Sequence, residues 1–210
     1  MDAVASINDL GVTVDQSLTF WEHIQNITVK AHARANLIIR CFISRDSNSL
    51  VKAFKTYVRP LLEYCSTVWS PSSMKGINAI ELVQRRFTKR LSGMKQLSYA
   101  QRLQQLKLDT LEVRRMRADL ILTYKILFGL VKVEATDIFT VSTTTQLRGH
   151  QYKLFLPRSN TEIRKHSFAV RTITLWNELP ADTISFDNIN GFKRSINRLD
   201  FSNYTNYDLD

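Results

Sequence analysis

Cysteine is scarce in this sequence, which contains two of them, Cys41 and Cys65. So small a number excludes a disulfide-rich scaffold. Both lie among apolar residues, so we expect buried free thiols in a protein kept in a reducing compartment. No apolar run approaches the about 20 residues of a membrane-spanning helix, and the N-terminus lacks the basic start and apolar stretch of a signal peptide. We therefore expect a soluble, intracellular protein, cytoplasmic or nuclear, without a membrane partner.

Acidic residues are also scarce, with 19 Asp and Glu against 29 Lys and Arg and a net charge of +10. No two aspartates are adjacent, so the paired carboxylates that hold two Mg²⁺ ions in nucleotide polymerases are absent. The six glycines are isolated and form no phosphate-binding loop. The four histidines are too far apart for a metal-ligand motif. The sequence thus predicts no catalytic residue, no metal site and no cofactor in this chain.

The longest well-patterned apolar surface lies in residues 50–91. Apolar residues recur there at steps of three and four, as on one face of a helix. Pro60 interrupts the pattern, so the first helix must kink or restart there, and the SPSS run at 70–73 separates it from a second helix. The pattern predicts a helical hairpin, and the second helix has an inward stripe of Ile77, Ile80, Val83, Phe87 and Leu91.

Large aromatic residues lie within the helical patterns at Tyr57, Tyr64, Trp69 and Trp176. Such residues could stack on nucleic-acid bases, but at helical spacing among Leu and Val they are more typical of a core. There is no aromatic pattern of the kind that reads RNA bases. We therefore expect core positions for them, and no sequence-specific recognition.

The rest of the chain also reads as helices. An alternating strand at 10–15 precedes a helix with capping-box spacing at Thr19 and Glu22 that runs to about Ile43. Further helices open at residues 50 and 98 and after Asp109, and the last of these stops at Gly129. The patterns of residues 163–178 and 188–199 predict two more helices. The expected fold is mainly α: a helical bundle with a short N-terminal strand and a smaller α-rich C-terminal module.

The domain boundaries follow from changes in composition. Residues 1–18 hold the strand and its turn, 19–139 the helical bundle, and 140–149 a polar linker that begins TVSTTT. Residues 150–200 form the small module. Residues 201–210 form a short polar tail that we expect to fray.

Basic residues gather in residues 81–117, where ten basic residues meet three acidic ones. They fall on two predicted helices, as Arg85, Arg86, Lys89 and Arg90 on the first and Arg114, Arg115 and Arg117 on the second. Such a pattern is typical of a solvated helix face, and it is also typical of a surface that follows phosphates. Arginine suits phosphate oxygens because its planar fork gives bidentate contacts. The pattern therefore leaves both a solvated face and nucleic-acid backbone binding open, and favours the second.

The same region carries a family resemblance. Residues 57–64 (YVRPLLEY), 68–71 (VWSP) and 81–89 (ELVQRRFTK) resemble a block of jockey-like non-LTR retrotransposon reverse transcriptases. In those polyproteins the block lies downstream of the catalytic palm, in the thumb and linker. The resemblance continues at 97–99 (LSY), 111–115 (LEVRR) and 176–180 (WNELP), and it covers residues 9 to about 199.

The resemblance implies that this chain is a catalytically inactive fragment of an RNA-directed DNA polymerase whose Mg²⁺ site lies elsewhere. Its basic helices would then contact the backbone of RNA or an RNA–DNA duplex, and the rest of a reverse transcriptase would be a further partner. In the family, residues 10–15 match one of the last palm strands, and here we expect that strand to lack a partner. The alternative is a helical scaffold that docks onto a partner, such as a polymerase domain, without binding nucleic acid itself.

Overall fold

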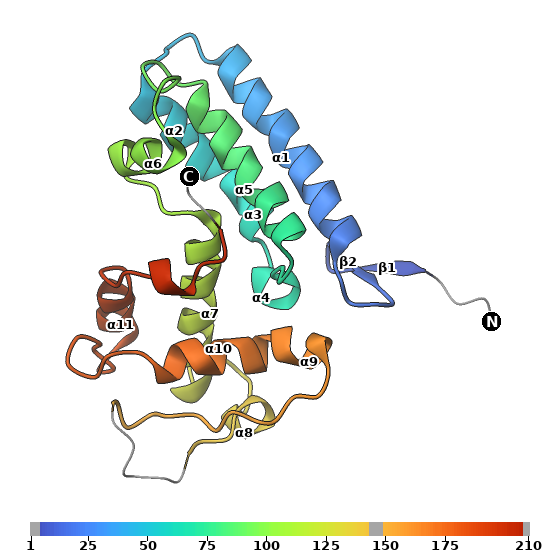
Figure 1. The fold of residues 1–210 in the computed structure, drawn as a ribbon, viewed down its shortest axis with the longest axis vertical. Helices are drawn as coiled ribbons and strands as arrows, with labels where there is room; N and C mark the ends of the chain where they lie inside the picture. Colours follow the sequence, from blue (N-terminus) through green and yellow to red (C-terminus); the bar gives the residue numbers. More distant parts are fainter. Residues whose placement is uncertain (1–4, 143–148, 208–210) are drawn as a thin grey trace. The chain divides into compact units, whose positions relative to one another are not determined.

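The computed structural model describes residues 5–142 and 149–207 of the chain, and its fold is mainly α, as predicted (Figure 1). The elements belong to two compact units. The first unit holds the residues up to Arg114 together with the chain from Thr205 onward, and the second holds residues 115–204. The division falls inside a helix, whereas the sequence predicted a linker at 140–149. Within that expected linker, residues 143–148 lie outside the described residues.

The first unit begins with an antiparallel hairpin of β1 (Ser6–Asp9) and β2 (Val12–Asp15). The turn between the strands uses two residues in the left-handed region, Leu10 at φ 46° and Gly11 at φ 86°. The predicted strand is therefore present, but it has a partner. The expectation of an unpaired strand was wrong because β1 is too polar to show a strand pattern in the sequence.

Asp15 connects the hairpin to α1 (Trp21–Cys41). Its carboxylate accepts hydrogen bonds from the backbone N–H groups of Thr19 (3.1 Å) and Phe20 (2.6 Å). The predicted capping box is wrong, because the N-cap of α1 is Phe20, at φ 55° and without a side-chain cap. The backbone N–H groups just before the helix are satisfied instead by Asp15, which lies five residues before the N-cap.

Three short helices follow α1, namely α2 (Ser47–Tyr57), α3 (Arg59–Glu63) and α4 (Ser66–Trp69). The side chain of Asp46 caps α2 by accepting from the backbone N–H of Ser49 at 2.7 Å, so this helix opens three residues before the predicted start. Pro60 lies in the first turn of α3. The helix therefore restarts at proline, which confirms one of the two predicted outcomes.

The longer helix α5 (Met74–Lys89) begins at Ser73, whose side chain accepts from the backbone N–H of Gly76. It lies beside α1 and runs in the same direction (Figure 1). A Cβ atom added to Gly76 would lie 2.7 Å from Pro71 and 3.4 Å from Ile24 of α1. Glycine at this position therefore permits the start of α5 to lie close to Pro71 and to α1. The predicted inward stripe of this helix is buried in full: Ile77, Ile80, Val83, Phe87 and Leu91.

The first unit continues with α6 (Tyr99–Leu106) and the start of α7 (Leu111–Leu127). Ser98 and Gln101 form a capping box on α6, in agreement with the predicted start at 98. At α7 the hydroxyl of Thr110 accepts from the backbone N–H of Val113 at 3.2 Å. The predicted cap at Asp109 is thus displaced by one residue.

The second unit contains the rest of α7 with α8 (Ala135–Ile138), α9 (Glu162–His166), α10 (Phe168–Asn177), α11 (Ile189–Ile196) and the 3₁₀ turn η1 (Ser202–Tyr204). The helix expected over 163–178 is broken at Ser167, whose ψ of 150° is extended. The core of this unit is aromatic. Tyr124 stacks on Phe192 at 4.6 Å between ring centres, and Trp176 packs against both Phe186 and Phe192 at 5.7 Å.

Several expectations about burial were wrong. Both cysteines are exposed, because Cys41 is the last residue of α1 and Cys65 is a left-handed residue, φ 56°, just before α4. Tyr57 and Tyr64 are 55% and 57% exposed, because the break at α3 ends the helical periodicity that would have turned them inward. Trp69 is buried, as predicted.

The C-terminal tail was also expected to fray, but its described part is packed. Phe201 and Tyr207 are buried. The backbone N–H groups of Asn206 and Tyr207 donate to the carboxylate of Glu112 at 3.1 and 2.9 Å. The chain therefore returns to the first unit over its last described residues.

Candidate nucleic-acid interface

A groove of about 500 Å³ lies between α1 and α5. Its floor is apolar and buried, and is formed by Ala35, Val83 and Phe87. Its walls are mostly polar and basic: His32 and Asn36 from α1 beside the apolar Val29, Arg86 and Lys89 from α5, and Arg90 directly after α5. The groove is limited to the middle of α1 and the last turns of α5.

The three α5 cations of this groove are exposed. Arg90 donates a hydrogen bond from its guanidinium to the side-chain oxygen of Asn36, which holds the guanidinium across the groove. Burial lowers the pKa of His32 below its ordinary value, and the nearby charge of Arg86 lowers it further. No carboxylate lines the groove among the described residues. A polyanion entering this groove would therefore meet positive charge and hydrogen-bond donors.

Arg85 does not share this face, although the sequence grouped it with the other three. Its guanidinium donates to the hydroxyl of Tyr207 at 3.3 Å and lies 5.8 Å from the ring centre of Tyr99. It is half-buried and lines a different groove, nearer the start of α5. The sequence could not separate it, since its partner Tyr207 is 122 residues away.

The basic residues of α7 do not form a second exposed face. Arg114 forms a bidentate pair with Glu63, with Nη2 and Oε2 3.0 Å apart. Arg115 is only 3% exposed. The guanidinium of Arg117 lies 5.4 Å from the ring centre of Phe201. These arginines are engaged within the protein, so the predicted phosphate-tracking surface is reduced to the end of α5.

The polar residues of α1 that line the groove, His32 and Asn36, were not predicted from the sequence. The signal that could have found them is their spacing, because positions four apart stack on one helix face and these two lie beside the buried position Ala35. What the sequence could not supply is the parallel pairing of α1 with α5, which brings residues more than 50 positions apart together.

Other kinds of site find no support in the part of the chain that the structure describes. Within residues 5–142 and 149–207, no three His, Cys, Asp or Glu side chains are grouped so that they could hold a metal ion. Over the same residues, no helix combines the length and the apolar character needed to cross a membrane.

No protein-family model matches this chain, and no solved structure matches it. A curated relative, an uncharacterized protein of Caenorhabditis elegans, is 29% identical over 126 residues. The matched segment covers 59% of this chain and 64% of that relative, so this chain spans less than two thirds of the relative's length. Because this relative is described only as uncharacterized, the match indicates no activity or ligand. The resemblance to reverse transcriptases is not supported by a family match and stays a prediction.

Proposed function

We propose that the first unit binds the phosphate backbone of a nucleic-acid duplex in the groove between α1 and α5. The single observation that carries this proposal is the exposed cluster of Arg86, Lys89 and Arg90 beside Asn36, with no carboxylate among the described residues that line the groove. Arginine and amide donors bind phosphate oxygens irrespective of base sequence. The binding is therefore not sequence-specific, and RNA or an RNA–DNA duplex is the proposed ligand.

The resemblance found in the sequence gives this binding a context. We infer that the chain is the thumb-like and linker part of a reverse-transcriptase polypeptide and holds template and primer while another part of that polypeptide performs catalysis. The sequence contains no pair of adjacent aspartates to hold catalytic Mg²⁺. The purified chain, given primer–template, Mg²⁺ and deoxynucleotides, is expected to extend no primer. Mg²⁺-dependent extension by the pure chain would refute this part of the proposal.

The direct test of binding replaces Arg86, Lys89 and Arg90 together by Gln. Each lost phosphate contact reduces the slope of log affinity against log salt by about 0.9 on a duplex. We expect weaker binding to an RNA–DNA duplex and a slope that falls by about 2 to 3. Fluorescence anisotropy across a salt series measures both. Because the three side chains are exposed, the thermal melt should change little.

A matched control separates the groove from net charge alone. Lys30, Arg34 and Lys52 are exposed cations of the same unit that do not line the groove. Their replacement by Gln removes the same three charges. We expect the control variant to keep nearly all of the duplex affinity. Equal losses in the two triple variants would show that the groove is only part of a general positive surface.

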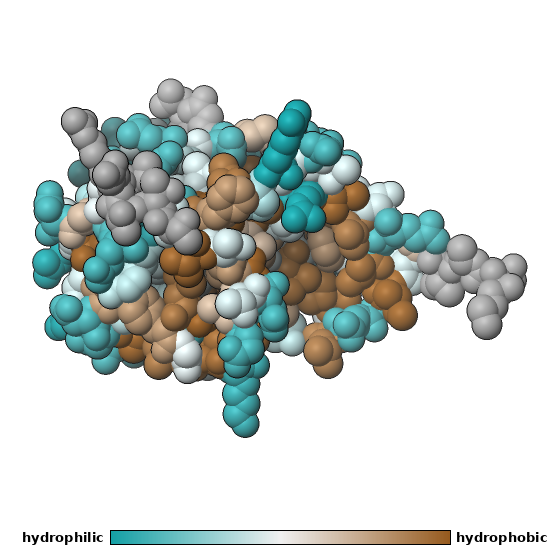
Figure 2. Space-filling view, turned by 90° about the horizontal axis from the view of Figure 1, so that it is seen from below, coloured by the Kyte–Doolittle hydropathy of each residue, from teal (hydrophilic) through white to brown (hydrophobic). Residues whose placement is uncertain are grey.

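A second candidate function is the helical scaffold, and the exposed apolar residues of the N-terminal hairpin favour it. Ile7 is 64% exposed and Leu10 is 83% exposed. Beside them, the hydroxyl of Tyr64 donates to the backbone oxygen of Leu10 at 3.0 Å. Figure 2 shows hydrophobic residues on the surface close to the N-terminal end. Docking of a polymerase domain on this surface would persist at high salt, whereas duplex binding would not.

A further inference from the structure

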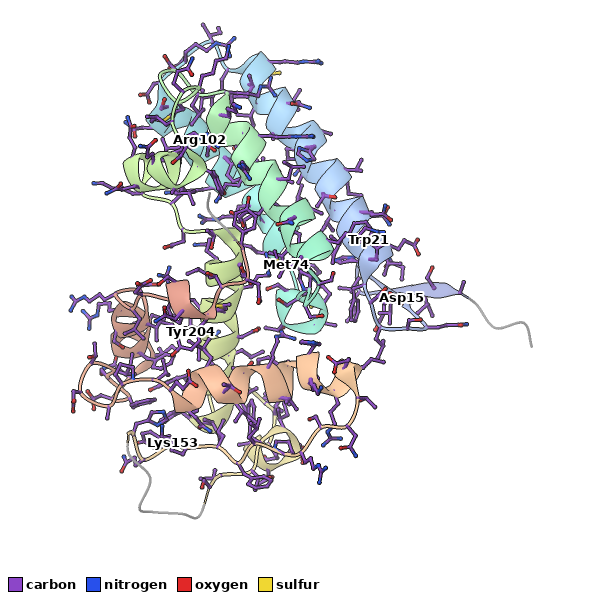
Figure 3. The ribbon with its side chains drawn as sticks, in the orientation of Figure 1. Asp15, Trp21, Met74, Arg102, Lys153 and Tyr204 are labelled. Atoms are coloured by element: carbon purple, nitrogen blue, oxygen red, sulfur yellow. The ribbon has the colours of Figure 1, made fainter. Side chains whose placement is uncertain are left out.

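A second groove, of about 570 Å³, lies nearer the start of α5 and also belongs to the first unit. It is assembled from three separate parts of the chain: the start of α1, the outer face of α5 and the C-terminal segment. Its lining includes Trp21, Lys75, Asn78, Leu82, Arg85 and Tyr207. Figure 3 marks Trp21 and Met74, which lie at the starts of α1 and α5 and both line this groove.

The groove combines aromatic rings with cations. The Lys75 ammonium lies 3.8 Å from the ring centre of Trp21, and the Trp21 ring itself is only partly buried. Arg85 is held by its hydrogen bond to Tyr207 and by the ring of Tyr99. Because the ammonium covers this face of the Trp21 ring, a base that stacks there displaces Lys75 toward a phosphate. An aromatic ring and two cations are thus present together, the combination that binds single-stranded nucleic acid.

The positions of these residues along α5 also suit a strand that follows the helix. Lys75 and Arg85 are ten residues apart, which is about 15 Å along the helix axis. Between them, the groove offers the amide of Asn78 and the apolar side chain of Leu82. No carboxylate lines the groove among the described residues. An anionic chain with bases between its charges matches this order better than a compact anion does.

The two grooves occupy different parts of the exposed arc of α5. At about 100° per residue, Asn78 and Arg85 lie roughly a quarter-turn from Arg86. Lys75 lies on nearly the same side of the helix as Arg86, but about three turns nearer the start of α5. Among the described residues, the aromatic rings of the first groove are the buried Phe87 and the imidazole of His32. The second groove is lined by two aromatic rings. The chemistry of the two faces is therefore different.

We propose that this second groove binds a short stretch of single-stranded nucleic acid, with a base stacked on Trp21 and phosphates on Lys75 and Arg85. This inference goes beyond the duplex binding proposed above and does not depend on it, since none of these three residues lines the first groove. With a duplex in the first groove and a single strand in the second, the two faces of α5 would hold a junction between paired and unpaired nucleic acid.

Tryptophan emission tests the proposal directly. The chain has three tryptophans, and Trp69 and Trp176 are fully buried, so only Trp21 is accessible to a base. We expect an oligo(dT) strand of about eight nucleotides to quench the emission, and an oligo(U) strand to do the same. Trp21→Phe should abolish the quenching and lower the affinity measured by anisotropy by about tenfold. The far-ultraviolet circular dichroism of the variant checks that it is folded.

A second variant keeps the reporter and removes a charge. Lys75→Gln retains Trp21 and should weaken the quenching, with a salt slope reduced by about 0.7, the value for one contact on a single strand. The triple Gln variant of Arg86, Lys89 and Arg90 serves as the control and should bind oligo(dT) with its quenching intact. Loss of duplex binding in that variant with retained quenching would separate the two sites.

Several results would overturn the proposal. The first is an absence of quenching by oligo(dT), and the second is quenching that survives in Trp21→Phe. A third is equal quenching by a blunt duplex, which would show that the groove has no preference for unpaired bases. A fourth is equal quenching by a poly-glutamate peptide, which would identify the ligand as an acidic protein segment. If the duplex fails to bind the wild-type chain and oligo(dT) still quenches, the duplex proposal fails and this one stands.

Discussion

At the scale of single residues, the buried carboxylate of Glu81 connects three helices of the first unit. Its Oε2 accepts from the backbone N–H of Leu111 at 2.8 Å, and its Oε1 accepts from the hydroxyl of Tyr99. Gln84 donates to the same hydroxyl at 3.0 Å and to the backbone oxygen of Asp109 at 3.0 Å. This network fixes α5 against α6 and the start of α7, and so fixes the helix that carries both grooves.

The network predicts the cost of losing Glu81. In Glu81→Ala, two buried donors lose their acceptor, and each unsatisfied group costs roughly 1–3 kcal/mol. We expect the free energy of unfolding to fall by about 3 kcal/mol or more, as measured by urea denaturation. Glu22→Ala, which removes an exposed carboxylate of α1, should cost at most about 1 kcal/mol. Similar losses in both variants would contradict the network.

His150, in the second unit, predicts a dependence of stability on pH. Its Nε2 donates to the backbone oxygen of Trp176 at 2.8 Å, and its Nδ1 accepts from the backbone N–H of Tyr152 at 3.2 Å. Burial lowers the pKa of His150; the bond to Trp176 opposes this shift, and the charge of Lys153 adds to it. Between the lowered value and about 6.5, the unfolded chain binds more protons than the folded one. Stability is therefore fully present above about pH 6.5 and is lost as pH falls through the folded-state value.

Thermal melts from about pH 7.5 to about pH 5 measure this loss. We expect His150→Gln to remove part of the dependence, because the substituted residue cannot take up the proton. The rest belongs to His23 and His32, whose pKa values burial also lowers. His166 is exposed and provides the matched control, so His166→Gln should keep the wild-type dependence. A steep loss that is unchanged in His150→Gln would assign the effect to other histidines.

At the scale of elements, the entry into α1 depends on one carboxylate. Asp15 accepts from the backbone N–H groups of Ser17, Thr19 and Phe20. Partial burial by itself would raise the pKa of Asp15, but these hydrogen bonds and that of the Thr19 hydroxyl lower it. The stability that Asp15 contributes is thus present above the ordinary value of 3.8 and is lost as pH falls further.

Asp15→Ala leaves those donors without the carboxylate and is expected to lower the free energy of unfolding by about 1–2 kcal/mol. Urea denaturation near neutral pH gives the value. Asp9 is an exposed aspartate of the same hairpin, and Asp9→Ala should be close to neutral. If Asp9→Ala costs as much as Asp15→Ala, the effect comes from the charge of the hairpin rather than from the connection to α1.

The elements that could be predicted from the sequence are those whose signals are local. The stripe of α5, the restart at Pro60 and the cap at Asn188, whose side chain accepts from Gly191, all depend on spacings of a few residues. The left-handed start of α1 at Phe20 could not be predicted, because its support comes from Asp15, outside the usual capping positions. The four-residue helix α8 is too short to show a period.

The candidate site could be predicted only in part, because some of its contacts join residues far apart in the sequence. Arg86, Lys89 and Arg90 follow from the helical period of α5, because the buried stripe leaves them outside. The pairing of Arg114 could not be predicted, because its partner Glu63 is 51 residues away. An arginine on a helix looks the same in the sequence whether it faces water or a distant carboxylate. The pairing of helices that decides this is a long-range property.

At the scale of the whole molecule, the chain leaves the first unit within α7 and returns to it after Tyr204. The returning segment is held by Glu112, whose carboxylate accepts from the backbone of Asn206 and Tyr207. The ring of Tyr207 packs edge-on against Tyr99 at 6.1 Å between ring centres. A segment near the end of the sequence therefore stabilises a unit formed mostly by its first half.

This topology predicts that Tyr207 and Tyr204, three residues apart, affect different units. Tyr207→Ala removes a buried aromatic ring and should destabilise the first unit by about 3 kcal/mol. Hydrogen exchange should then become faster in peptides of α5 and α6, and exchange in α10 and α11 should stay unchanged. Tyr204 belongs to the second unit, and a hydrogen bond with Glu178 raises its pKa. Tyr204→Ala should leave exchange in α5 and α6 as it is in the wild type. Faster exchange in α10 and α11 of Tyr207→Ala would mean that the two units unfold together. Equal exchange in α5 and α6 of both variants would refute the stabilisation of the first unit by the returning segment.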